Sequence, residues 1–331
     1  MNAPRVSCVT VTYGVTPTLW AMLESLSRTT SRSETEVIVV AQPDASGSMA
    51  AEILRRYSSV HLIDLDENIG FGAANNLAID RASADRVALL NPDLVLPEGW
   101  LAPLEDALLD SSVTIASPPL LTPMGEVDEA GQIMYADGGS EPFGQSGFVT
   151  PYERVMFSRD IDYASAACWL MRRSDFTKLG GFAPEYSPAY FEDVDLAFRV
   201  WKSGGRCRLV SNRPVIHDHA SASSDRVALA VRSREVFRAK WSGELLHQPV
   251  RFIGKESCER VRDHRCSEHH RVEIGRRTSD DEARRLVDEA GRWAADNPTE
   301  RATVRIDSRP MVEEWRRAWC HRGLEIVTTE S

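Results

Sequence analysis

Asp93 is the side chain whose position in the sequence most clearly suits ligand chemistry. It follows four apolar residues, Val87–Leu90, and the short turn Asn91-Pro92. Four such residues in a row fit a strand covered on both faces, and a proline cannot continue the hydrogen bonding of a sheet. Open α/β sheets bind ligands outside the carboxyl ends of their strands, where a carboxylate can hold a divalent cation and its bound diphosphate. The alternative interpretation is an aspartate that only shapes an Asn-Pro-Asp turn.

Glu192 and Asp193 are adjacent carboxylates at the predicted start of a helix. They follow the pair Gly180-Gly181 and a loop rich in aromatic residues. A carboxylate in such a place can act as a general base if it comes within hydrogen-bond reach of a hydroxyl. The competing interpretation is helix capping, because the helix dipole stabilises carboxylates in the first turn. Asp195 and Arg199, four residues apart, predict an ordinary salt bridge on the same helix.

His217 and His219 flank Asp218 after an extended segment. Side chains two residues apart in a strand point the same way, so both histidines can face one site. With Asp93 at another strand end, a histidine here can complete a metal site of mixed oxygen and nitrogen ligands. A single histidine with a purely structural role is the competing interpretation.

Alternating strands and helices are expected to position these side chains. Strands at Val6–Thr12, Glu36–Val40 and Val60–Leu65, with helices between them, predict a doubly wound sheet. The segment Asn68–Asn76 then opens a helix, and its glycines allow close approach of the backbone to a ligand. Its spacing is not that of a dinucleotide-binding fingerprint. Residues 117–160, rich in proline and glycine, predict irregular loops with short strands, and such long loops often form a lid or binding surface.

The charge distribution divides the chain in two. Residues 1–224 hold 17 basic and 29 acidic residues, whereas residues 225–331 hold 22 basic and 20 acidic residues. After Ser224 the pattern changes to charged helices, near residues 227–241, 280–295 and 310–321. At 331 residues there is room for one large α/β domain with an appendage. We therefore predict a large α/β domain over residues 1–224 and a mostly helical extension over 225–331, which can serve homo-oligomerisation.

Composition excludes several classes of protein. The net charge of −10 argues against a general nucleic-acid or membrane-surface binder. No apolar run reaches membrane-spanning length, and a strand begins directly after residues 1–5, so neither an integral membrane segment nor a signal peptide is expected. The six cysteines lack zinc-site spacing and are expected to be reduced. These features predict a cytoplasmic protein.

Several of these segments, in this order, resemble family 2 inverting glycosyltransferases of the GT-A fold, above all the rhamnosyltransferase-like branch. The resemblance covers roughly residues 5–240, and residues after about 250 resemble no family that we can name. It implies a doubly wound, mostly parallel central sheet flanked by helices. The segments that carry it are Val9–Tyr13, Asn68–Asn76, Leu89–Asp93, Ala167–Phe182, Phe191–Arg199, Val215–His217 and the basic stretch Arg232–Trp241.

The resemblance also implies roles for the matching residues. Asp93 matches a ligand of a divalent metal, Mg²⁺ or Mn²⁺, that bridges the donor diphosphate, and His217 matches a further ligand. Asp193 matches the catalytic base, with Glu192 as its neighbour. The positions that match donor contacts are Thr12, Tyr13, Asn68, Gly70, Asn75 and Asn91. The implied reaction is direct displacement, in which a sugar moves from a nucleoside diphosphate, for example a deoxythymidine diphosphate rhamnose, to an acceptor hydroxyl.

Some positions depart from the family pattern. Asn91 stands at the first carboxylate of the DxD element, which puts the strength of metal binding in doubt. Ala41 stands where an aspartate commonly contacts the nucleotide base, and Asp44 in the following loop is the candidate substitute. Gly14 replaces a common asparagine, and Ala183 a common aspartate.

Two other functions compete with an active glycosyltransferase. A nucleotidyltransferase would need a glycine- and lysine-rich phosphate loop after the first strand, and Tyr13–Pro17 lacks it. A decayed transferase that only binds carbohydrate, or serves as a scaffold, is favoured slightly by Ala41 and Asn91. The retained Asp93 and Asp193 count against it. The acceptor, a glycan or a small molecule, stays open.

Overall fold

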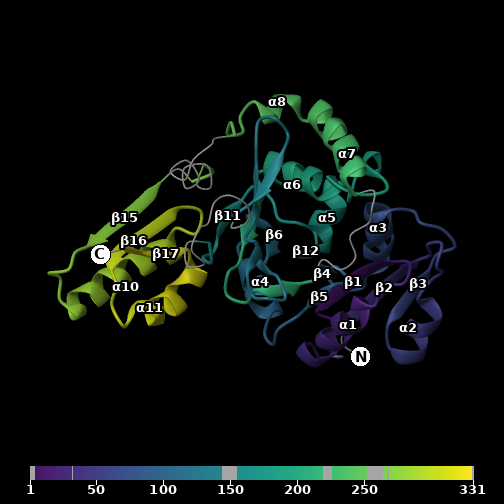
Figure 1. Cartoon of the computed structure of the whole chain (residues 1–331), viewed down its shortest axis with the longest axis horizontal. Coiled ribbons are helices and arrows are strands. Elements are labelled where there is room, and N and C mark those ends of the chain that lie inside the picture. Colours follow the sequence, from purple (N-terminus) through teal and green to yellow (C-terminus); the bar gives the residue numbers. More distant parts are fainter. Residues whose placement is uncertain are drawn as a thin grey trace.

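A mixed eight-stranded sheet runs through the larger part of the chain in the computed structural model, which describes residues 4–31, 33–143, 155–218, 226–251, 264–266 and 268–329 (Figure 1). In sheet order its strands are β11 (Arg159–Ile161), β13 (Arg206–Leu209), β6 (Val113–Ser117), β12 (Cys168–Arg172), β4 (Arg86–Leu90), β1 (Val6–Tyr13), β2 (Thr35–Gln42) and β3 (His61–Asp64). Strands β4, β1, β2 and β3 are parallel neighbours, as are β6 and β13. Only β12 and β11 run antiparallel to their neighbours. The prediction of a mostly parallel sheet is confirmed.

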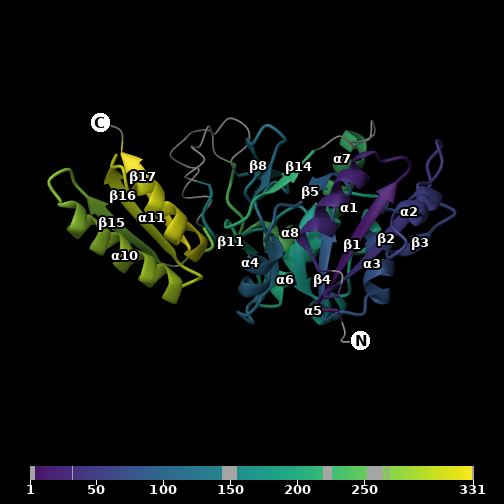
Figure 2. The ribbon, with the colours of Figure 1, turned by 90° about the horizontal axis from the view of Figure 1, so that it is seen from below.

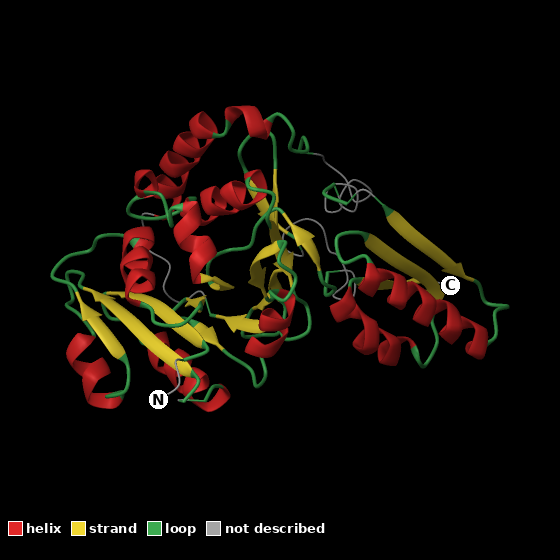
Figure 3. Cartoon of the chain, turned by 180° about the vertical axis from the view of Figure 1, so that it is seen from behind, coloured by secondary structure: helices red, strands yellow, loops and turns green. Residues whose placement is uncertain are grey.

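Helices cover both faces of this sheet, as Figure 3 shows. Along β1, Val9 and Val11 face one apolar layer, and Val6 and Cys8 face the other. Helices α3 (Phe71–Arg81), α5 (Arg173–Leu179) and α6 (Glu192–Lys202) pack on the first face. Helices α1 (Thr18–Thr29), α2 (Ala50–Arg56) and α4 (Leu101–Ala107) pack on the second. Because both faces are buried, the strands read as continuous apolar runs in the sequence.

A smaller sheet lies beside the end of β4. Its strands, in order, are β5 (Leu94–Val95), β14 (Val215–His217), β7 (Leu120–Leu121) and β8 (Val127–Glu129), and a hairpin of β9 (Gln132–Met134) and β10 (Ser140–Pro142) follows. Strand β14 pairs antiparallel with β5, so that His217 lies opposite Leu94. The pairing therefore brings His217 next to Asp93. Loops with short strands were predicted for residues 117–160, and the described part of this segment has that character.

The predicted domain boundary after residue 224 does not match the packing. Helix α7 (Arg226–Lys240) and the short α8 (Ser242–Leu245) lie against α6 in the larger unit (Figure 1). The Phe198 ring of α6 contacts Phe237 and Trp241 at centroid distances of 4.9 and 5.4 Å. The change in charge after residue 224 marks a more exposed helix, and the hydrophobic core continues across it.

Asp195 fixes this docking from the interior of the protein. Its side chain is fully buried and accepts hydrogen bonds from Trp241 Nε1 at 2.7 Å and from the Tyr186 hydroxyl at 3.1 Å. It also pairs with Arg199 at 2.8 Å, as predicted, and with Lys240 at 2.8 Å. Two cations and two neutral donors around this carboxylate offset the free-energy cost of burying its charge.

The C-terminal residues form a second α/β unit, at the left of Figure 2. Three parallel strands, β15 (His269–Ile274), β16 (Arg301–Asp307) and β17 (Leu324–Thr329), carry α10 (Asp280–Asp296) and α11 (Val312–Trp319) on one face. The two helices agree with the predicted charged helices. The three-stranded sheet differs from the mostly helical extension that the sequence predicted, because apolar residues alternate with polar ones in β15 and β16 and form no continuous apolar run.

The two units meet at Phe157 and Ser158, just before β11. The Ser158 amide donates to the carbonyl of Cys320 at 3.0 Å, and the Arg301 guanidinium lies 3.9 Å from the centre of the Phe157 ring.

Among the helices that the structure describes, none combines the length and the apolar character needed to span a bilayer.

Candidate active site

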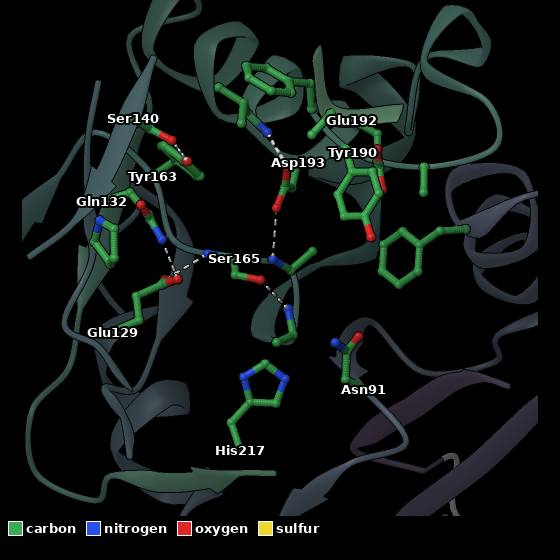
Figure 4. A pocket seen from close by; sticks show the side chains of 18 of the residues that line it. Asn91, Glu129, Gln132, Ser140, Tyr163, Ser165, Tyr190, Glu192, Asp193 and His217 are labelled. Atoms are coloured by element: carbon green, nitrogen blue, oxygen red, sulfur yellow. Dashed lines mark hydrogen bonds between the residues drawn. The ribbon is translucent and has the colours of Figure 1, made fainter. Parts of the chain in front are cut away.

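A cavity of about 840 Å³ opens at the carboxyl ends of β1 and β4 (Figure 4). The chain continues from β1 to β2 on one side, whereas β4 lies on the other side of β1. Ligands of open α/β sheets bind at such a reversal of strand order. The polar side chains that line the cavity include Tyr13, Asn91, Asp128, Glu129, Gln132, Ser140, Tyr163, Ser165, Glu192, Asp193 and His217.

Asp193 lies in the first turn of α6 and faces the cavity. The two residues before this helix, Tyr190 and Phe191, have positive φ angles of 74° and 71°, which non-glycine residues rarely adopt and which often occur at functional sites. One oxygen of Asp193 accepts from the Val194 amide at 2.8 Å and the other from the Ala166 amide at 3.3 Å. Burial raises the pKa of Asp193, so its carboxylate is a stronger base than an exposed aspartate.

Glu192 lies beside Asp193 and is buried. Its Oε2 atom has no hydrogen-bond partner within the described ranges of the chain. Burial and the negative charge of Asp193 raise the pKa of Glu192 well above its usual value. The two adjacent carboxyl groups therefore favour a single negative charge, and Asp193, which accepts two amide hydrogen bonds, is the better place for it.

Asp93 and His217 are brought together, as predicted. His217 Nε2 lies 3.3 Å from Asp93 Oδ1, and Nδ1 lies 3.3 Å from Asp128 Oδ2. All three side chains are buried. Burial by itself lowers the pKa of His217, but the two carboxylates outweigh it and raise the pKa to about 9. The surroundings of this imidazole thus favour a positive charge at the edge of the cavity.

This arrangement fits a divalent cation. Metal-bound histidines commonly donate their other ring N–H to a carboxylate, which is the relation of His217 to Asp128. That contact leaves Nε2 to face Asp93, whose carboxylate is the kind of ligand that suits Mg²⁺ or Mn²⁺. His217 would join it as a nitrogen ligand on losing the Nε2 proton, so metal binding there would release a proton. In the parts of the chain that the structure describes, no three His, Cys, Asp or Glu side chains converge into a complete metal site. Magnesium-type sites commonly use one or two protein ligands and complete the shell with substrate phosphates and water. His219, the other histidine of the motif, lies outside the described residues.

The predicted contacts at the ends of β1 and β2 lie at different depths. Tyr13 lines the cavity and is half-exposed, whereas Thr12 is buried and donates to the Thr16 hydroxyl at 3.0 Å. The carboxylate of Asp44 lies over Gly14, so close that a Cβ at Gly14 would lie 2.0 Å from Asp44 Oδ2. Glycine at position 14 therefore makes room for Asp44 at the same sheet edge as Tyr13. Ala41 is buried at the end of β2 and offers no polar group.

Asn91 lines the cavity with Tyr13, but the other five predicted donor contacts do not: Thr12, Asp44, Asn68, Gly70 and Asn75. Asn68 Oδ1 accepts from the Gly70 amide at 2.9 Å, and Asn75 is buried with its side-chain amide donating to the Phe71 carbonyl at 2.9 Å. Gly70 packs against the backbone of Pro188. These residues shape the start of α3, which carries Phe71 into the cavity wall. Their direct contact with a donor stays a prediction.

Residues 7–180, just over half of the chain, match the sequence model of glycosyl transferase family 2. The chain belongs to this family. It is also 30% identical, over 274 residues, to an N-acetylglucosaminyl-diphospho-decaprenol L-rhamnosyltransferase of Mycobacterium tuberculosis (strain ATCC 25618 / H37Rv); the match covers 74% of this chain and 87% of the relative. Both findings confirm the resemblance seen in the sequence motifs.

Solved structures of glycosyltransferases share the fold of this family 2 member. GalNAc-T7 with UDP, GalNAc and Mn²⁺ aligns with a TM-score of 0.59 and 15% identity, over 74% of this chain and 49% of that chain. The mannosyltransferase PcManGT of Pyrobaculum calidifontis, in complex with GDP-Man and Mn²⁺, aligns with a TM-score of 0.52 and 18% identity, over 72% and 65%. This chain therefore spans about half of the first protein and about two thirds of the second. At these identities the likeness is one of fold, and the fold is GT-A.

The sequence did not indicate two carboxylates of this glycosyltransferase cavity, Asp128 and Glu129. Both come from β8, inside the segment predicted to be irregular. Glu129 is buried and accepts from the Ser165 amide at 2.8 Å and from Gln132 Nε2 at 2.6 Å. Burial raises the pKa of Glu129 to about 7, against the hydrogen bonds that lower it. The one available signal was the pair of adjacent acidic residues in a stretch without basic residues.

Proposed function

We propose that this family 2 glycosyltransferase is a metal-dependent, inverting enzyme that moves a sugar from a nucleoside diphosphate to an acceptor hydroxyl. The observation that carries the proposal is the pairing of two sites in one cavity. A buried carboxylate, Asp193, lines one wall, and His217, which pairs with Asp93 just beyond the end of β4, lines the cavity as well. Figure 4 shows Asp193 above and His217 below, with Ser165 between them in this view.

This separation suits a single displacement with inversion. The attacking hydroxyl and the leaving diphosphate must lie on opposite sides of the anomeric carbon. Asp193 accepts the proton of the acceptor hydroxyl while the new C–O bond forms and the bond to the diphosphate breaks. The Val194 and Ala166 amides keep its two oxygens in place during this step. Asp93 and His217 would hold the divalent cation, which supplies positive charge to the departing diphosphate.

The identities of the donor and the acceptor are proposed from the name of one relative and the position of one side chain. The Mycobacterium relative is by its name an L-rhamnosyltransferase that acts on a lipid-linked N-acetylglucosamine. It supports a sugar of the rhamnose type as the transferred group and a glycan hydroxyl as acceptor, and the resemblance of the sequence motifs suggests deoxythymidine diphosphate as its carrier. We propose that Asp44, whose carboxylate lies over Gly14, takes the role of the absent aspartate at Ala41 and contacts the nucleotide base.

A donor panel with one variant tests the proposal. Purified protein meets UDP-, GDP- and dTDP-sugars with and without Mn²⁺ or Mg²⁺, and binding and turnover are measured for the wild type and Asp193→Asn. We expect metal-dependent binding of one nucleotide class in both proteins. Turnover should fall by about 10²-fold or more in the variant, because the general base is lost.

Asp80→Asn, a change of an exposed aspartate on α3, is the matched control and should retain wild-type turnover. Equal turnover in Asp193→Asn and wild type would contradict the role of Asp193. If no nucleotide sugar binds under any metal condition, the protein is a decayed member that acts as a carbohydrate-binding module or scaffold.

A further inference from the structure

A β-bulge turns two consecutive carboxylates of β8 into the cavity. Strand β7 pairs Leu120 with Glu129 and Leu121 with Val127, which leaves Asp128 as an extra residue in β8. In a regular strand Asp128 and Glu129 would point to opposite faces of the sheet. Here both line the cavity, and bulges are known to re-aim side chains next to active sites. Asp128 contacts His217, so the role of Glu129 has to be sought at the other end of the cavity.

Glu129 holds the segment that contacts Asp193. Its Oε1 accepts from the amide of Ser165 at 2.8 Å, and the next amide, that of Ala166, donates to Asp193 Oδ2 at 3.3 Å. Figure 4 shows these two hydrogen bonds side by side, with Glu129 and Asp193 on either side of Ser165. The direction of the Ala166 N–H therefore depends on the anchoring of the peptide before it.

The same segment is fixed at its far end. The Ala167 amide donates to the Ser165 hydroxyl at 3.3 Å, and the Ala167 carbonyl accepts from the Asn91 amide at 2.8 Å. Three consecutive residues thus connect Glu129, Asp193 and the turn that leads to Asp93. Because Ser165, Ala166 and Ala167 have small side chains, few other contacts can orient this part of the chain.

We propose that Glu129 is a positioning residue for the base Asp193, acting through the peptide segment Ser165–Ala167. The inference rests on the proposed function, since it assigns Asp193 as the base. Glu129 fixes the Ser165 amide, the Ala166 amide then points at Asp193, and the Asp193 carboxylate is held toward the acceptor position. The Gln132 side chain, 2.6 Å from Glu129 Oε2, fixes the Glu129 rotamer in turn.

Two substitutions separate the hydrogen bonds of Glu129 from its charge. Glu129→Ala removes the acceptor for the Ser165 amide and should lower turnover by about 10²-fold, the cost of a base displaced by about 1 Å, with the donor KM nearly unchanged. Glu129→Gln keeps an acceptor oxygen and should stay within about threefold of wild type. Because burial raises the pKa of Glu129 to about 7, its carboxyl is largely protonated on the acid side of the pH–rate profile, and the acid limb of Glu129→Gln should stay close to that of the wild type. Glu126→Ala, at an exposed residue of the same loop, is the matched control.

Amide hydrogen exchange gives a readout that does not depend on turnover. Exchange at Ser165 and Ala166, resolved to single residues by mass spectrometry with fragmentation, should be faster by about tenfold or more in Glu129→Ala and close to wild type in Glu129→Gln and Glu126→Ala. Unchanged protection of Ala166 in Glu129→Ala would overturn the proposal, as would wild-type turnover in that variant. If the wild type turns over no donor, the proposed function fails, and the Ala166 exchange still decides whether Glu129 holds the amide that contacts Asp193.

Discussion

Asp128 shows how a buried carboxylate can set the orientation of a neighbouring imidazole. Its carboxylate lies 3.3 Å from His217 Nδ1, on the far side of the ring from Asp93. It therefore favours a proton on Nδ1 and fixes the orientation of the ring. Partners of this kind commonly change metal affinity by 10- to 100-fold when they are removed.

We predict that Asp128→Ala weakens Mn²⁺ binding, measured by calorimetry in the presence of a nucleoside diphosphate, by about 10- to 100-fold. Asp128→Asn should lie between this variant and the wild type, because its side-chain oxygen still accepts from Nδ1. Glu126→Ala should bind Mn²⁺ as the wild type does. Equal affinities of Asp128→Ala and wild type would show that the ring orientation is set by other contacts.

The site residues that could be predicted from the sequence differ physically from those that could not. Asp93, Asp193 and His217 stand next to an element boundary, and a strand end or helix start can be read from local spacing. Asp128 and Glu129 reach the cavity only because a bulge in β8 pairs against β7. Such a bulge depends on the register between two short strands, which no local pattern encodes.

At the scale of elements, the start of α3 is coupled to the turn before α6. Gly70 precedes α3 with a φ of 90°, and its backbone lies against Pro188, whose carbonyl accepts from the Phe71 amide at 2.8 Å. The same turn carries Tyr190 and Phe191 into the cavity wall. Packing between distant segments therefore accounts for a glycine at this position.

We predict that Gly70→Ala destabilises the protein by about 1–3 kcal/mol, because alanine is strained at positive φ and its Cβ would lie 2.7 Å from the Pro188 carbonyl oxygen. Gly47→Ala is the matched control, since Gly47 has a φ of 111° and open space around it. Thermal unfolding of both variants separates the strain, which they share, from the clash, which only Gly70→Ala has. Equal losses of stability would show that the contact with Pro188 relaxes at no cost.

At the scale of the whole molecule, the C-terminal unit is the part that the sequence described least well. Its helices were found because apolar residues recur with helical spacing along 280–296 and 312–319. Its strands were missed because β15 and β16 carry charged or polar residues at alternate positions, such as Arg271, Glu273 and Arg305. These residues lie on the opposite face of the strands from the apolar core. That core forms only when the three segments pair in parallel, which the sequence of any one segment does not indicate.

Two residues that precede β15, His264 and Arg265, contact the catalytic domain at Asp162, which directly precedes Tyr163 of the cavity wall. Asp162 is buried and receives the Arg265 guanidinium and His264 Nε2, the latter at 3.1 Å. Arg265 also lies 3.9 Å from the centre of the Trp201 ring, and Trp201 Nε1 donates to the Asp162 carbonyl at 3.0 Å. Burial by itself raises the pKa of Asp162, but Arg265 and His264 outweigh it and hold the pKa at about 2.

We predict that Arg265→Ala destabilises the protein by about 2 kcal/mol at pH 7, since each unit of pKa shift corresponds to ~1.4 kcal/mol. An aspartate whose pKa is lower in the folded state contributes stability above its unfolded pKa, near 4, and loses it as the pH falls toward 2. The difference between variant and wild type, measured by urea unfolding, should therefore narrow between pH 5 and pH 2.5. Arg55→Ala, which breaks an exposed pair with Glu52, should cost less than about 0.5 kcal/mol at either pH. A loss in Arg265→Ala that does not change with pH would assign the effect to packing on Trp201, and the charge of Asp162 would then have no part in holding the C-terminal unit to the catalytic domain.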